Sequence, residues 1–191
     1  MKNIRLSLLF VFLGTVFVQP SFGQLIRTAA KSNLSDSVNL ILAGFGNNFW
    51  SIQGNAIDTQ SDPATYQSRY TLPGSRGAVI TRYSSVEDSS ASWQAVVFES
   101  EEFQTAAKAY RKWIQDLKSV RIRFLTGQAR FTGDVEKPDE NLRFTTTGLV
   151  FLTSDLQYRQ LHAEVSLLSD LASWQVQVSF YRRKIQEAQS D

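Results

Sequence analysis

The chain has 191 residues, with no cysteine, one histidine, and 20 Lys and Arg against 18 Asp and Glu. The lack of cysteine excludes disulfides, thiol nucleophiles and thiolate metal sites. Lys2 and Arg5 belong to a predicted export signal, and without them the chain carries 18 residues of each sign. A formally neutral chain gives no reason to expect nucleic acid or an anionic membrane as a partner.

Residues 1–23 have the pattern of a secretory signal peptide, with a basic start, an apolar run and a polar end. The apolar run from Leu6 to Val18 is shorter than the roughly 20 residues of a membrane-spanning helix. Ser21 and Gly23 are small residues at the minus-three and minus-one positions of a cleavage site. We therefore expect an exported protein, periplasmic or secreted. An uncleaved anchor is the less favoured alternative.

The first half of the chain predicts one helix and three strands. Apolar residues recur every three or four positions over 34–52, which is typical of one face of a helix. Gly44 and Gly46 weaken its middle, so a bend or break is expected there. Residues 55–65 have the composition of a loop. Alternating polar and apolar residues then predict strands over 66–72, 78–84 and 91–99.

The second half predicts a similar order. A stripe of apolar residues over 103–120 is the clearest helical periodicity in the chain. Residues 121–141 leave two alternatives open, a short strand or a segment held only by a few apolar side chains. Three further strands are predicted over 142–153, 156–168 and 172–182, followed by a polar tail at 184–191.

The tetrapeptide "ASWQ" occurs at 91–94 and again at 172–175, each time at the start of an alternating run. Its position favours two pseudo-repeats of helix-strand-strand-strand, over about 33–100 and 101–183. We expect a single α+β domain over 24–191, an antiparallel sheet of about six strands with two helices on one face. Trp93 and Trp174 would then be related core residues. A Trp at alternating strand positions more commonly belongs to a core than to a ligand cleft.

Few residues suggest catalysis, a metal or a cofactor. His162 has no nucleophile close to it on its predicted strand, which favours an exposed sheet histidine over a catalytic base. An acidic loop could supply oxygen ligands to calcium, but its spacing does not match an EF-hand and a solvated loop is favoured; its acids are Asp134, Glu136, Asp139 and Glu140. We therefore expect no metal, no cofactor and no catalytic residue.

The polar side of the predicted sheet is the remaining candidate for a binding site. Amphipathic aromatic and amide side chains are common in binding patches. An ordinary solvent-facing sheet surface is the alternative. The candidate binding residues are Tyr158, His162, Gln175, Gln177, Tyr181 and Gln94.

These observations favour an exported domain of non-enzymatic type. It is expected to bind an unknown protein or small ligand through the outer sheet face, with no integral membrane segment after signal cleavage. Two alternatives stay open. One is a hydrolase with two convergent carboxylates in an unrecognised cleft. The other is an envelope assembly component that pairs through its edge strands.

Overall fold

The computed structural model describes residues 33–84, 90–124, 127–170 and 172–183, all of which belong to the compact unit Lys31–Asp191. The predicted signal peptide over 1–23 and the polar tail over 184–191 lie outside the described residues. Within the described part, no helix has the length and apolar character that crossing a membrane requires.

The first helix is shorter than the periodicity predicts. It begins after Asn33, whose side-chain oxygen accepts a hydrogen bond from the backbone N–H of Ser35 at 3.2 Å. It ends before Gly44, so the predicted break falls at the first glycine. Two single 3₁₀ turns continue the chain and keep its apolar side chains in the core. The elements are α1 (Leu34–Ala43), η1 (Phe45–Asn47) and η2 (Trp50–Ile52).

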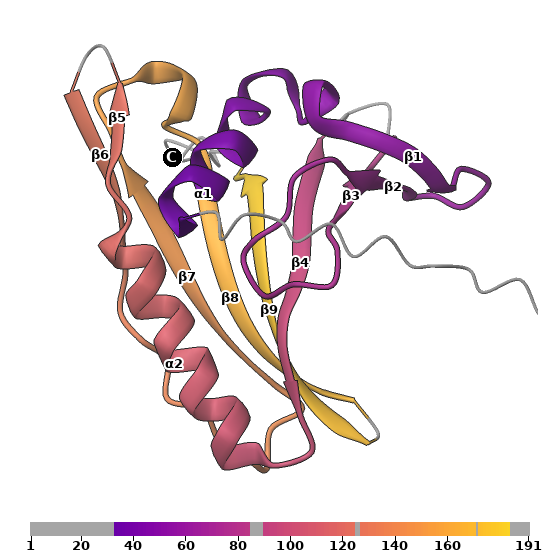
Figure 1. Cartoon of the computed structure of the whole chain (residues 1–191), viewed down its shortest axis with the longest axis vertical. Coiled ribbons are helices and arrows are strands. Elements are labelled where there is room, and N and C mark those ends of the chain that lie inside the picture. Colours follow the sequence, from indigo (N-terminus) through magenta and orange to yellow (C-terminus); the bar gives the residue numbers. More distant parts are fainter. Residues whose placement is uncertain (1–32, 85–89, 125–126, 171, 184–191) are drawn as a thin grey trace, which may run out of the picture. The chain divides into compact units, whose positions relative to one another are not determined.

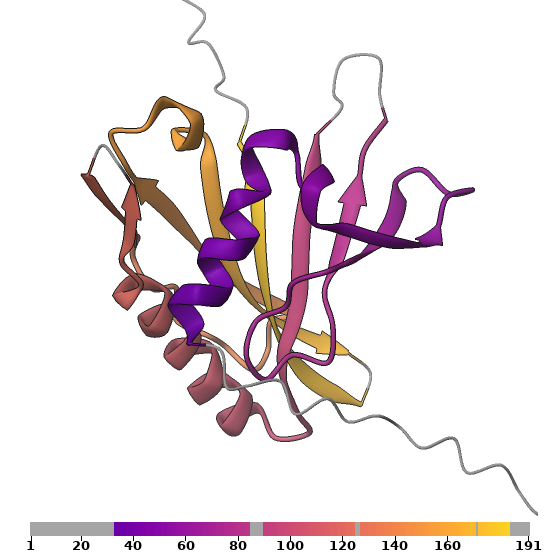
Figure 2. The same cartoon turned by 45° about the horizontal axis from the view of Figure 1, so that its top comes forward.

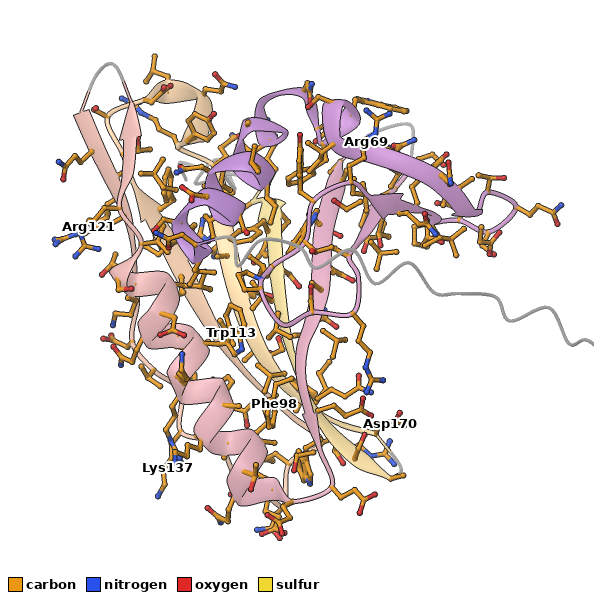
Figure 3. All side chains as sticks on the ribbon, viewed as in Figure 1. Arg69, Phe98, Trp113, Arg121, Lys137 and Asp170 are labelled. Carbon is orange, nitrogen blue, oxygen red and sulfur yellow. The ribbon has the colours of Figure 1, made fainter. Side chains whose placement is uncertain are left out.

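The second helix, α2 (Phe103–Ser119), confirms the prediction over 103–120. Its stripe of apolar residues is buried, and Trp113 beside it is partly buried against the same core (Figure 3). The hydroxyl of Tyr110 shares a hydrogen bond of 2.6 Å with the hydroxyl of Thr147, deep in the core. This bond ties the helix to the sheet beneath it.

The sheet is antiparallel throughout and larger than the expected six strands. Within the described residues, eight strands form the main sheet and β5 adds a ninth through a short ladder with β6, in the order β1-β2-β3-β4-β9-β8-β7-β6-β5. The strands are β1 (Gln53–Asp58), β2 (Ala64–Ser68), β3 (Val79–Arg82), β4 (Ala91–Ser100), β5 (Ile122–Phe124), β6 (Gly127–Thr132), β7 (Phe144–Leu152), β8 (Leu161–Asp170) and β9 (Ser173–Arg182).

The extra strands lie where the sequence pattern is weakest. Residues 55–58, predicted as loop, belong to β1, and that prediction was wrong. β1 is an edge strand whose pairing with β2 is interrupted twice, and most of its side chains are half-buried or exposed, so no clean alternation marks it. For the open question over 121–141, the described residues show two short strands, β5 and β6, followed by a segment without regular secondary structure over 133–139.

Both helices lie on one face of the sheet, as predicted (Figures 1 and 2). Buried side chains of α1 and α2 join the inward side chains of the strands in one hydrophobic core. We call the opposite side of the sheet the open face. It carries Gln94, Gln177 and His162, and no described helix covers it (Figure 2).

The two copies of "ASWQ" lie on β4 and β9, which are neighbours at the centre of the sheet. Trp93 is fully buried, and its indole N–H donates to the hydroxyl of Ser68 at 2.9 Å. Trp174 is partly buried and meets the ring of Phe103 edge-on, with centroids 4.9 Å apart. Both therefore pack on the helix side, although their surroundings differ. Among the described residues, the first predicted repeat holds four strands and the second holds five, where three were expected in each. The duplication therefore stays a prediction.

Candidate functional site

The registers of β4, β9 and β8 set polar side chains of the open face in transverse rows. In one row Ser92 lies opposite Tyr181, which lies opposite His162. In the next row Gln94 lies opposite Ser179, which lies opposite Glu164. Directly opposite residues of an antiparallel pair are close enough for their side chains to interact. β4 and the consecutive strands β8 and β9, which are far from β4 in the sequence, thus contribute to one surface.

These rows enclose a pocket of about 240 Å³, which we call the polar pocket. Hydroxyl, amide and carboxylate groups dominate its lining. In a further row Gln177 lies opposite both Val96 and Ser166, and of these three residues Gln177 and Ser166 line the pocket. The lining residues that matter for its chemistry are Ser92, Gln94, Glu164, Ser166, Gln177 and Tyr181.

Small hydroxyl side chains form the floor of the polar pocket. The hydroxyl of Ser166 shares a hydrogen bond of 2.9 Å with Thr146, and that of Ser179 accepts one from the Gln177 amide at 3.2 Å. Ser92 is 7% exposed, and its hydroxyl has no hydrogen-bond partner in the described part of the chain. A buried hydroxyl without a partner costs about 1–3 kcal/mol. A ligand or water that hydrogen-bonds Ser92 would remove this cost.

Tyr181 and Glu164 are joined across the polar pocket. The phenolic hydroxyl of Tyr181 donates to the Glu164 carboxylate at 2.6 Å. Burial, together with the hydrogen bond and negative charge of Glu164, raises the pKa of Tyr181 well above its usual value. The phenol therefore stays protonated and keeps donating at any physiological pH.

His162 flanks this pair without entering the pocket. Its ring stacks on that of Tyr181 with centroids 6.1 Å apart. Burial, and secondarily the positive charge of Arg183, lowers the pKa of His162, while Glu164 acts in the opposite direction. The imidazole is therefore neutral at neutral pH. Among the described residues, Glu164 and Arg182 are the charged residues that line the pocket.

The open face also holds an apolar groove of about 410 Å³ beside the polar pocket. Gln94 and Gln177 line both hollows, so the two adjoin. Ile57 and Val96, at 56% and 37% exposure, leave much apolar surface in contact with solvent. We call this surface, formed by Ile57, Ala78, Val79 and Val96, the apolar groove.

The structure brings most of the predicted site residues together. Gln94, Gln177 and Tyr181 line the polar pocket, and His162 stacks on Tyr181 at its edge. His162 is half-buried, whereas the sequence predicts an exposed histidine. Gln175 lies on the same face one row beyond the pocket, opposite Glu99 on β4.

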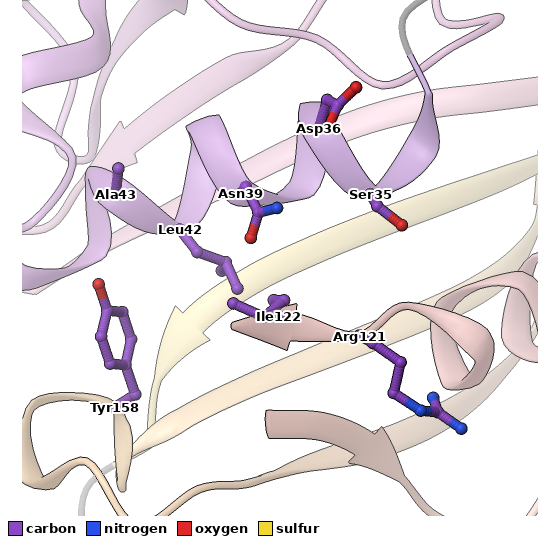
Figure 4. Close-up of a pocket in the computed structure, with 8 residues that line it drawn as sticks. All are labelled: Ser35, Asp36, Asn39, Leu42, Ala43, Arg121, Ile122 and Tyr158. Atoms are coloured by element: carbon purple, nitrogen blue, oxygen red, sulfur yellow. The ribbon is translucent and has the colours of Figure 1, made fainter. Parts of the chain in front are cut away.

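Tyr158 is not part of this surface, and its placement on the open face was wrong. It belongs to the 3₁₀ turn η3 (Leu156–Tyr158), which Asp155 caps by accepting from the N–H of Gln157 at 3.0 Å. Its buried ring stacks on Phe45 with centroids 5.9 Å apart. It lines a separate hollow of about 450 Å³ between α1 and the start of β5 (Figure 4).

Several residues of the polar pocket are not among the candidates drawn from the sequence, and Ser92 and Tyr83 are two of them. Ser92 could have been found, because it alternates with the inward Trp93 and therefore shares a side with Gln94. Tyr83 follows the end of β3, beyond the alternating run. Its approach to the pocket depends on how β3 pairs with β4, which the alternation does not specify.

Nothing in the described residues assembles a metal centre, since no group of three or more metal-ligating side chains was found there. In the acidic loop, Asp139 instead accepts hydrogen bonds from the backbone and side chain of Asn141. Glu164 is the one carboxylate among the described residues that line the polar pocket. The arrangement supplies several hydrogen-bonding groups and one carboxylate, which suits binding of a polar group.

Comparison with known proteins finds no family model, no curated protein and no solved structure that matches this chain. We therefore infer function from the geometry and chemistry of the open face.

Proposed function

We propose that this protein is an exported binding domain that holds its partner, a macromolecule or a small ligand, on the open face of the sheet. The observation that carries the proposal is Ser92, a residue that lines a pocket on this face and whose buried hydroxyl has no described partner. The amides of Gln94 and Gln177 converge on the same hollow. Natural proteins seldom leave a buried polar group unpaired without a reason.

The two alternatives have less support. A carboxylate-dependent hydrolase needs two acids that face each other across the substrate, and Glu164 lines the polar pocket without a second described carboxylate. Assembly through an exposed edge is disfavoured at β1, because its register shifts twice and an irregular edge resists pairing with another chain.

The test is a panel of sugars, peptides, nucleotides and lipids, screened by chemical-shift changes in NMR spectra of the protein without residues 1–23. We expect ligands to perturb Gln94 and Gln177. The double variant Gln94→Ala with Gln177→Ala should weaken the strongest ligand by about tenfold or more, because each lost hydrogen bond is worth about 0.5–1.5 kcal/mol.

Gln104→Ala is the matched control, since Gln104 is an exposed amide on α2, on the other side of the sheet. It should leave both folding and affinity unchanged. A ligand whose affinity is the same for the double variant and the wild type would refute the open face as its binding surface.

A further inference from the structure

The polar pocket and the apolar groove adjoin on the open face. A ligand that fills both must therefore have a polar part and an apolar part. Gln94 and Gln177 form the boundary, with hydroxyl groups on one side and aliphatic side chains on the other. The two hollows have volumes of about 240 and 410 Å³. Together they fall in the range of small-molecule sites, which begins at about 300 Å³.

The polar pocket favours an uncharged group with several hydroxyls. Its lining offers both donors and acceptors, the serine hydroxyls and the two glutamine amides. An anion would lie against the Glu164 carboxylate, which is unfavourable in a partly buried site. Arg182 also lines the pocket, but its guanidinium donates to Gln160 at 3.0 Å and lies over the ring of Phe45, a core residue, so the charged group is directed away from the hollow.

The apolar groove favours an aliphatic chain. Val79 and Val96 lie on its floor, and Ile57 forms an exposed wall from β1. Covering such side chains removes apolar surface from water, which contributes about 25 cal/mol per Å². A ligand that spans the boundary at Gln94 and Gln177 gains this contribution in addition to its hydrogen bonds in the pocket.

We infer that the open face binds a glycoside with an apolar substituent, with its sugar ring in the polar pocket and its aliphatic chain in the apolar groove. The inference rests on the proposed function and names its ligand class. Ser92 lines the pocket, but its hydroxyl is closed to solvent. A small rearrangement on binding would let this hydroxyl exchange a hydrogen bond with a sugar hydroxyl, which gives it the partner that the described residues lack.

Four probes separate the two parts of the ligand: hexyl glucopyranoside, glucose, 1-hexanol and hexyl sulfate. Titrations followed by NMR should give hexyl glucopyranoside an affinity at least about tenfold higher than that of glucose or hexanol, because only it fills both hollows. Hexyl sulfate should bind no better than hexanol, since its charged group meets Glu164.

Two variants assign the parts to residues. Ser92→Ala should weaken hexyl glucopyranoside several-fold while leaving the stability of the protein equal or higher, because the variant removes an unpaired buried hydroxyl. A merely structural serine would lose stability instead. Val96→Ser should reduce the advantage of the hexyl chain and leave glucose affinity unchanged. Gln104→Ala again serves as the control.

The outcomes also separate this inference from the proposed function. Equal affinities for glucose and hexyl glucopyranoside would refute the inference that the ligand fills both hollows. So would a charged or peptide probe that perturbs Gln94 and Gln177 when no glycoside does, although that result supports binding on the open face. If no probe of any class perturbs this face, both proposals fail.

Discussion

His162 and Tyr181 lie beside each other on the open face, and their protonation depends on this position. Burial holds the pKa of His162 below its ordinary value of 6.5, and Arg183 adds to the effect. Tyr181 is held in the protonated form by burial and by Glu164. A protonated phenol in the polar pocket and a neutral imidazole at its edge thus lie next to the Glu164 carboxylate.

The lowered pKa of His162 predicts a loss of stability in mild acid. As the pH falls below about 6.5, the unfolded chain takes up a proton on His162 that the folded protein still resists, so the free energy of unfolding decreases. His162 is the one histidine of the chain. The variant His162→Gln should therefore reduce the change in unfolding free energy between pH 7 and pH 5.5, measured with urea at constant ionic strength. The same pH dependence in both proteins would contradict this assignment.

At the scale of elements, the two "ASWQ" strands differ in how firmly the core holds them. Trp93 is fully buried, packs on Phe180 with ring centroids 5.5 Å apart, and donates to Ser68. Trp174 packs on Phe103 near the start of β9 and keeps some exposure. Trp93 and Trp174 are therefore expected to contribute unequally to the free energy of unfolding.

We expect Trp93→Ala to cost about 3–5 kcal/mol of unfolding free energy, as typical for a large buried aromatic residue. Trp174→Ala should cost at least about 1 kcal/mol less, because less of its side chain is removed from water. Chemical denaturation of both variants measures the difference. If Trp93→Ala does not fold, Trp93→Phe and Trp174→Phe allow the same comparison. Equal costs would show that the two residues have equivalent surroundings.

The same elements show what the sequence can predict. The helix α2 and the strands β4 and β9 were predicted correctly, because a long regular period of buried side chains marks each of them. β1 was missed because an edge strand with an interrupted register has no buried face of its own. The strand prediction over 156–168 began too early, because Asp155 caps a 3₁₀ turn where the alternation of apolar residues continues by coincidence.

The candidate site was predictable as a face but not as a pocket. Alternation along each strand correctly assigns Gln94, Gln177 and Tyr181 to the outer side. It cannot show that β9 lies between β4 and β8, and this strand order determines which side chains become neighbours. For the same reason, the sequence places Ser92 on the outer side but does not show that its hydroxyl lacks a hydrogen-bond partner.

At the scale of the whole molecule, the proposed function requires export. The structure describes the chain from residue 33, so the predicted signal peptide needs a test of its own. We expect expression of the full chain in a Gram-negative host to give a protein that begins at Gln24, because Ser21 and Gly23 form a signal-peptidase site. Mass spectrometry of the periplasm and the medium measures this. Replacing Gly23 with a large residue should block processing, and an intact chain that stays in the cytoplasm would refute export.

The position of β9 between β4 and β8 has a consequence for when the protein can fold. One neighbour of β4 in the sheet, β3, directly precedes it in the chain. The other neighbour, β9, is synthesised only after α2 and four intervening strands. Such distant pairing slows folding, because a long loop must close before the contacts form. An emerging chain therefore keeps the centre of its sheet incomplete until residues 173–182 appear. Under the export that we propose, in which the chain would cross a membrane unfolded, this late completion would keep the chain competent for transport.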